Sequence, residues 1–531
     1  MLLALSVPLV LLPGPPAAAF KPVQGSGLRQ PVYAAQTALP ARAGDLDTTF
    51  GGDGKVVTDF GQLDAVEDLS VQADGKIVAV GTTVSRTTSV DAQFALARYG
   101  RDGALDAGFG VAGKVTTDFG GRAGAAYAVA IQGDGKIVAA GLAASGGQTG
   151  ADIALARYNV DGSLDESFGA GGKVLTDFDS THEEAQGLAI QPDGKLVVVG
   201  STRLSGPIGT NPPDFALARY HSNGSLDTSF DGDGRVSTGF TAGWADRGYG
   251  VAVARDGKVV AAGLAVPAAA SGPGVIAVAR YNADGTLDAS FDEDGRVVSA
   301  PSIDNGAFGV LVLRDGKVVV AGSVFGPRAN LALVRYTVDG LLDSTFGTGG
   351  IASADFGPRA AGGRDLVRQP DGKLVAAGTV YSQSGEPNEF AFAVARFGQS
   401  GKPDRSFHGG STSTDLGAWD EAQAVALQPD GKIVVGGFSG RLPSGGTVTA
   451  QDFAVARYLA AALPCMVPNV RTRTLAVARS MITKAHCRVG KVRWKPSVQV
   501  QRGRVISQSQ KAGTKLPNGS KLNLVVSSGR R

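Results

Sequence analysis

Gln132-Gly133-Asp134-Gly135-Lys136-Ile137-Val138-Ala139-Ala140-Gly141 decides the fold, because its Asp-Gly-Lys core returns at a nearly constant spacing. A fixed period of this kind is the mark of a repeat architecture. Residues that recur in every copy are expected to hold the repeat together rather than to carry out chemistry once. The seven copies begin at Asp74, Asp134, Asp193, Asp256, Asp315, Asp371 and Asp430, at intervals of 60, 59, 63, 59, 56 and 59 residues.

Each copy predicts four short strands. In the second unit these are 113–119, 127–132, 136–141 and 153–158, and a tight Gly-Asp-Gly turn joins the middle two. A Gly/Asp-rich turn at 161–169 leads to the next unit. Seven such units predict an all-β, seven-bladed β-propeller. A β-helix or an array of β-sandwiches is the alternative, but those units need about 20 or about 100 residues.

The order of the strands predicts how the ring closes. The strand Gly54–Phe60 precedes the first complete unit, whereas the strand Phe453–Tyr458 ends the seventh. If Gly54–Phe60 is an outer strand, the N-terminus completes the last blade and leaves no open sheet edge. Residues 45–459 are then one closed domain.

Charge is divided unevenly along the 531 residues. Residues 464–531 hold 15 Lys and Arg and no acid, whereas residues 1–463 hold 36 basic and 48 acidic residues. We therefore expect a mildly acidic propeller joined to a basic module. Residues 1–19, apolar and ending in small residues, predict a signal peptide, and residues 20–44 a Pro/Ala-rich linker. The apolar run is too short to span a membrane, so no transmembrane span is expected.

Several spaced elements of the repeat resemble the bacterial Delta-60 repeat family. The resemblance implies an extracellular repeat protein with propeller-like blades and no established activity. In the last copy the Leu-Asp-x-x-Phe element is reduced to residues 402–407, so that turn departs from the family pattern. The matching elements are Leu164-Asp165-x-x-Phe168-Gly169, Gly172-Lys173-Val174, Gln191-Pro192-Asp193-Gly194-Lys195 and Phe215-Ala216-Leu217-Ala218-Arg219-Tyr220.

The basic module predicts an amphipathic helix at 475–486, a strand from Gly490 and a hairpin at 505–527. With Val467-Pro468 and Gly513-Thr514 as landmarks, this order resembles a single PASTA domain. The resemblance implies association with cell-wall peptidoglycan or muropeptides. Cys465 and Cys487 bracket the helix and predict a disulfide, because two Cys and one His make a poor zinc set.

Catalytic signals are absent from the sequence. The histidines, His182, His221, His408 and His486, occupy different places in different units, and no nucleophile elbow, zinc-protease or phosphate-loop motif occurs. The Asp-rich strings at 51–54, 231–234 and 292–295 lack calcium-loop spacing and have acid-free sister copies, so we interpret them as turns. We expect no catalytic residue, cofactor or metal.

One Arg and one Asp recur in each unit. A charged ligand ring is one interpretation, and a charge-assisted hydrogen bond from each Arg to the adjoining turn is the favoured one. The residues are Arg98, Arg157, Arg219, Arg280, Arg335, Arg396 and Arg457, with Asp47, Asp106, Asp165, Asp227, Asp288, Asp343 and Asp404.

Loops that vary between copies are the candidate binding surface, although simple sequence drift explains them equally well. They are 82–93, 142–152, 201–214, 264–275, 379–389 and 438–452, on the face opposite the Asp-Gly-Lys turns. Trp244 and Trp419 fall in equivalent loops of that face, where an exposed Trp suits a glycan or protein partner.

The hypothesis is an exported, monomeric, non-enzymatic binding or scaffold protein that the basic module holds at the peptidoglycan, with no nucleic-acid partner. The alternative is a secreted hydrolase or lyase that uses the propeller as a catalytic platform. Convergence of acidic residues from different blades on the ring axis would favour the alternative.

Overall fold

The computed structural model describes residues 41–530 except 62, 85–91, 145–149, 179–181, 204–211, 268–273, 300–302, 325–328, 383–389, 418, 442–449, 462–463 and 518. The expected signal peptide and most of the expected linker lie outside the described residues. The chain divides into Ala43–Ala461 and a second compact unit that includes Ala462–Arg531. Each unit has hydrophobic clusters of its own.

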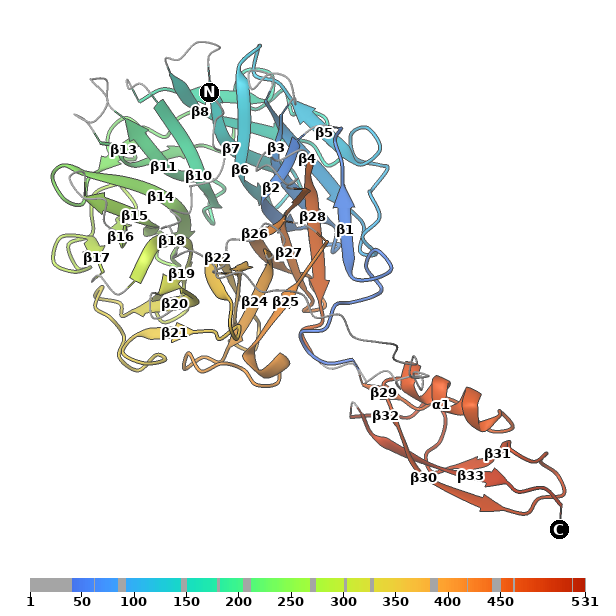
Figure 1. Cartoon of the computed structure of the whole chain (residues 1–531). Coiled ribbons are helices and arrows are strands. Elements are labelled where there is room, and N and C mark those ends of the chain that lie inside the picture. The colour runs from blue at the N-terminus through green and yellow to red at the C-terminus, as the bar shows by residue number, and fades with distance from the viewer. Residues whose placement is uncertain are drawn as a thin grey trace, which may run out of the picture. The chain divides into compact units, whose positions relative to one another are not determined.

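The unit Ala43–Ala461 is a ring of seven antiparallel four-stranded blades (Figure 1). The inner strands are β2 (Leu63–Val71), β6 (Ala123–Ile131), β10 (His182–Ile190), β14 (Trp244–Val253), β18 (Ile303–Val312), β22 (Ala360–Arg368) and β26 (Trp419–Leu427). The second strands are β3 (Ile77–Val84), β7 (Ile137–Ala144), β11 (Leu196–Arg203), β15 (Val259–Pro267), β19 (Val318–Val324), β23 (Leu374–Tyr381) and β27 (Ile433–Arg441). The prediction of a seven-bladed propeller is therefore confirmed.

The remaining strands complete each blade toward the outside of the ring. The third strands are β4 (Gln93–Tyr99), β8 (Ala151–Tyr158), β12 (Asp214–Tyr220), β16 (Val275–Tyr281), β20 (Asn330–Tyr336), β24 (Ala391–Phe397) and β28 (Ala450–Tyr458). The outer strands are β1 (Lys55–Thr58), β5 (Lys114–Thr117), β9 (Lys173–Thr176), β13 (Arg235–Thr238), β17 (Arg296–Val298), β21 (Ile351–Ser353) and β25 (Ser411–Thr414), the last preceded by the short helix η2 (His408–Gly410).

The ring closes as the strand order predicts. The N-terminal strand β1 pairs antiparallel with β28, from Lys55 opposite Ala456 to Thr58 opposite Phe453, and so supplies the outer strand of the seventh blade. The inner strands contact one another all round the ring, and β26 contacts β2. The position beside β28 on the last blade is therefore filled by β1.

The core consists of seven clusters, each shared by two adjacent blades. Between the first and second blades, for example, Phe94 and Val80 pack against Ala139 and Ile137, all fully buried. The same arrangement recurs at the other six interfaces, including the one that joins the seventh blade to the first. Apolar burial therefore stabilises the contacts between blades as well as the blades themselves.

A β-bulge interrupts every inner strand at the same place. In β10 the register shifts between Ala185 and Gly187, which leaves Gln186 as the extra residue. The glycine that ends each Ile-Val-Ala-Ala-Gly string lies opposite the bulge, and a Cβ at Gly200 would collide with the carbonyl oxygen of Glu184. The repeated glycine is thus required by the bulge, which re-aims one side chain per blade.

The C-terminal unit contains one helix and five strands among its described residues. Helix α1 (Leu475–Lys484) is capped by Thr474, whose hydroxyl accepts from the Val477 amide, and its buried residues are Ala478 and Ile482. They pack on the sheet of β30 (Arg488–Lys495), β33 (Lys521–Ser527) and β31 (Val505–Gln508), in that order. A two-stranded ladder joins β29 (Cys465–Met466) to β32 (Lys515–Leu516).

The predicted disulfide is present. Cys465 on β29 and Cys487, three residues after α1, are bonded and lie in the unit's buried cluster. The bond ties the first strand to the end of the helix. The predicted helix and the antiparallel pairing of β31 with β33 are also as the sequence indicates.

Candidate functional site

In every blade the recurrent Arg pairs with the recurrent Asp, and we call these seven pairs with their partners the lattice. In the third blade, Asp227 lies 2.7 Å from Arg219 Nε and 2.9 Å from Lys195 Nζ, the lysine of the Asp-Gly-Lys turn. The Arg219 guanidinium also stacks 4.5 Å from the Phe230 ring centroid and donates to the Ala283 carbonyl of the next blade. All seven Arg–Asp pairs recur with separations of 2.6–2.9 Å.

The electrostatics of this lattice follow from its geometry. Burial alone would raise the pKa of Asp227, but hydrogen bonds from Ser229 and Lys195 and the charge of Arg219 hold it well below its usual range. Arg219 and Asp227 are each about 3–4% exposed. Because each Arg serves its own turn and the next blade, the favoured interpretation of the recurrent pairs is confirmed.

The Asp-rich strings at 51–54, 231–234 and 292–295 are also structural, because each forms a turn. Asp53, Asp233 and Asp294 each accept a hydrogen bond from the backbone amide two residues ahead, at 2.8–3.0 Å. This is the local geometry of an Asx turn, which needs no ion. The histidines are also dispersed: His182 begins an inner strand, and His408 lies 2.5 Å from Asp45.

Residues that differ between blades converge on the ring axis. The bulge places one side chain of each inner strand at the same level, and these seven are Glu67, Tyr127, Gln186, Tyr249, Phe308, Arg364 and Gln423. Five different residue types at one repeated position contrast with the uniform Arg–Asp pairs farther out. We call these seven residues the axial layer. It is a position at which the repeats differ, so it is a candidate for function rather than for holding the repeat together.

Three acids and two cations from five blades act on groups of this layer: Glu67, Glu184 and Glu421, with Arg247 and Arg364. Burial raises the pKa of Glu67 to about 8, partly opposed by the charge of Arg364 and reinforced by that of Glu421. Burial also raises the pKa of Glu421, which accepts a 2.8 Å hydrogen bond from Trp419 Nε1. Glu67 and Arg364 belong to the first and sixth blades, so their charges interact across the axis rather than between neighbours.

Aromatic rings complete the axial layer. The Tyr249 and Phe308 ring centroids lie 4.8 Å apart, and the Arg364 guanidinium lies 4.6 Å from the Phe308 centroid. Burial raises the pKa of Tyr127 well above its ordinary value, and the charges of Glu184 and Glu67 add to the effect. The convergence of acids proposed as the discriminator of a catalytic platform is thus met by Glu67, Glu184 and Glu421.

Trp244 and Trp419 begin inner strands β14 and β26, but both are partly buried rather than exposed. Trp244 packs against the cluster shared by the third and fourth blades. The Trp419 ring centroid lies 5.3 Å from that of Phe390, and Trp419 Nε1 donates a hydrogen bond to Glu421 beside the axial layer. Most of the variable loops lie outside the described residues.

The C-terminal unit presents a cationic surface. Of its described Lys and Arg residues, only Arg504 is not exposed, and the sequence of this unit supplies no acid to pair with them. Trp494, 54% exposed, lies on β30 between exposed Arg493 and Lys495, and Val498 follows with 74% exposure. Sequence reasoning missed Trp494, although a tryptophan between two cations in an acid-free segment is a readable signal.

The geometry defines a closed seven-bladed β-propeller followed by a small, basic α+β unit. By sequence, the chain belongs to the family described as a domain of unknown function (DUF5122) beta-propeller, and it carries a PASTA domain at residues 466–528. The propeller family is matched at 72–109, 132–168, 191–230, 254–291, 313–346, 369–407 and 428–460. These matches agree with the two resemblances noted in the sequence.

Solved structures similar to the chain include a catalytically inactive virginiamycin B lyase from Staphylococcus aureus, with 10% identity and a TM-score of 0.41, covering 76% of this chain and 98% of that one. The propeller domain of the Trilobed protease from Pyrococcus furiosus is 12% identical, with a TM-score of 0.38 and coverage of 75% and 94%. No helix among the described residues is long and apolar enough to cross a membrane.

Proposed function

We propose that this protein is an extracytoplasmic, non-enzymatic binding protein whose PASTA domain attaches it to peptidoglycan and whose propeller is the presented scaffold. The observation that carries the proposal is the PASTA match at residues 466–528, which coincides with an independently packed unit. The disulfide of that unit supports an oxidising, extracytoplasmic location.

Charge supports the division of roles. The basic unit carries +15 and residues 1–463 carry −12 by formal count. A polyanionic envelope would attract the first and repel the second, through a field screened over about 8 Å at physiological salt. The exposed Trp494 adds an aromatic face that ionic strength does not weaken.

Retention on isolated cell walls tests the proposal. The full chain should sediment with the walls, and a chain ending at residue 461, which keeps every propeller strand and its seven clusters, should stay in solution. Retention of the full chain should fall as salt rises without reaching zero. Equal retention of the two chains would refute the assignment of attachment to the C-terminal unit.

The axial layer favours one second candidate, a hydrolase or lyase. With its pKa near 8, Glu67 is largely protonated at neutral pH and could donate a proton, while Arg364 could stabilise developing negative charge. Release of soluble fragments from walls or acidic polysaccharides, lost in Glu67→Gln and retained in Glu166→Gln on an exposed turn, would replace the binding proposal with this one.

A further inference from the structure

In five of the seven blades a buried or half-buried glutamine lies at the junction between adjacent Asp-Gly-Lys turns. It stands two residues before the turn's Asp, as Gln72, Gln132, Gln191, Gln369 and Gln428. Gln428 Nε2 donates to the Gly75 carbonyl of the next blade at 2.8 Å, and its Oε1 accepts from Arg457 Nη1 at 3.1 Å. Gln191 Nε2 reaches the Gly257 carbonyl in the same way, at 3.4 Å.

The fourth and fifth blades depart from this rule together. Ala254 and Leu313 replace the glutamine, and the next residues are Arg255 and Arg314, where the other copies have Ala, Gly or Pro. Two adjacent blades therefore lack the glutamine side chain, which we call the plug, and carry an arginine beside its position.

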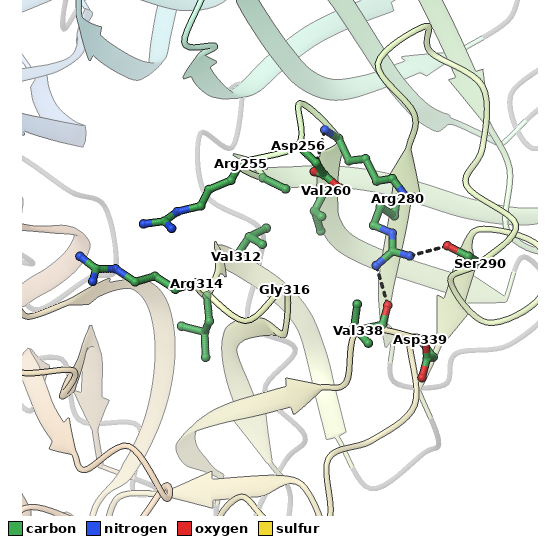
Figure 2. Close-up of a pocket in the computed structure, with 13 residues that line it drawn as sticks. Arg255, Asp256, Val260, Arg280, Ser290, Val312, Arg314, Gly316, Val338 and Asp339 are labelled. Atoms are coloured by element: carbon green, nitrogen blue, oxygen red, sulfur yellow. Dashed lines mark hydrogen bonds between the residues drawn. The ribbon is translucent and has the colours of Figure 1, made fainter.

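The missing glutamine leaves a pocket (Figure 2). The cavity, of about 310 Å³, is lined by Ala254, by Arg280 and by Gly316, the counterparts of Gln428, Arg457 and Gly75 at the filled junction. Val260, Val312 and Val338 supply apolar wall. Arg280 itself is committed to Asp288, Ser290 and the Val338 carbonyl, so it stays part of the lattice.

Arg255 and Arg314 are the free cations of this pocket. Both are exposed and line it, and among the described residues neither has an ion pair or a side-chain hydrogen bond. In Figure 2 their side chains extend to the same side from neighbouring turns. Two acids also line the pocket, Asp256 and Asp339; Asp256 accepts a hydrogen bond from the Lys258 amide at 3.2 Å, and Lys258 Nζ pairs with Asp288 at 2.7 Å.

We propose that this pocket binds a small oxyanion-bearing ligand, whose carboxylate, sulfate or phosphate group lies between the Arg255 and Arg314 guanidiniums and whose body rests on the valine wall. A guanidinium offers a planar fork of donors that suits such oxygens, and two of them from separate blades fix the ligand's position. The site belongs to the propeller and does not depend on wall attachment by residues 462–531.

Calorimetric titration of the full chain at low ionic strength tests the proposal. The probes are sodium sulfate, galacturonic acid as an acidic saccharide, and galactose as its neutral counterpart. Saturable binding of sulfate or galacturonic acid, without binding of galactose, is expected. Tighter binding of galacturonic acid would identify a saccharide ligand, and tighter binding of sulfate a free inorganic one. No binding of either anion would overturn the proposal.

Two variants distinguish binding in the pocket from nonspecific attraction of anions to positive charge. Arg255→Gln with Arg314→Gln should weaken binding about tenfold or more, whereas Arg405→Gln, an exposed arginine on the same face, should leave it unchanged. Ala254→Gln keeps both arginines but restores the plug, so it should also weaken binding while unfolding no more easily. Anion binding that survives Ala254→Gln and the double change would overturn the assignment.

Discussion

The blades are joined by buried hydroxyl pairs whose energetic coupling can be measured. Tyr220 on β12 donates a 2.8 Å hydrogen bond to Thr176 on the outer strand of the preceding blade, and both residues are buried. Burial raises the pKa of Tyr220 well above its usual value, so the hydroxyl stays neutral. The junction between the fifth and sixth blades has lost both partners: Phe397 replaces the tyrosine, Ala354 after the fifth blade's outer strand replaces the threonine, and the two lie in one apolar cluster.

This natural replacement sets the expected magnitudes. Tyr220→Phe alone leaves a buried threonine hydroxyl without the tyrosine, which costs about 1–3 kcal/mol of unfolding free energy. Thr176→Ala alone leaves the tyrosine hydroxyl in the same position and should cost a similar amount. The double variant reproduces the Phe397–Ala354 pair and should cost clearly less than the sum, with a coupling of about 1–2 kcal/mol.

Urea unfolding of the four proteins gives the coupling directly. The reverse exchange is the matched control: Phe397→Tyr should destabilise the sixth blade, and Ala354→Thr in the same chain should recover part of the loss. If the costs of Tyr220→Phe and Thr176→Ala simply add, the hydroxyl pair does not join the blades in the way described.

Three further results are expected. Deleting residues 41–61 removes β1, so amide exchange in β28 should accelerate; unchanged exchange there would rule out closure by β1. The folded-state pKa of Glu67 lies near 8, above its unfolded value, so its ionisation should lower the free energy of unfolding as pH rises from about 4.5 through about 8. The urea midpoints at about pH 5 and about pH 9 should therefore differ less in Glu67→Gln than in the natural chain. An equal difference in the two proteins would remove Glu67 as the cause. Trp494→Ala should reduce wall retention at high salt and Val498→Ala should not; equal effects would deny Trp494 a specific contact.

Features that recur in every repeat could be predicted from the sequence. Arg219 and Asp227 recur in step, so their pairing in each blade could be inferred, and the offset position of β1 was sufficient to predict closure. The paired loss at Phe397 and Ala354 was also readable, because two repeat positions change together in one copy.

The axial layer and the pocket could not be predicted in the same way. Glu67 and Arg364 are distant in sequence, and their charges act on each other only because a bulge in each inner strand falls at the same level of a closed ring. Strand alternation alone does not place a bulge. The pocket depends on the side chain that Ala254 lacks, and a pattern built from what the copies share conceals such departures.

Binding of a soluble, uncharged muropeptide to the full chain tests the central claim, attachment through the PASTA domain, most directly. A purely cationic surface would not bind such a probe, whereas specific contacts with peptide or sugar would. We expect saturable binding that persists at high salt and disappears in the chain ending at residue 461. Absence of binding by the full chain, or equal binding by the shortened chain, would contradict it.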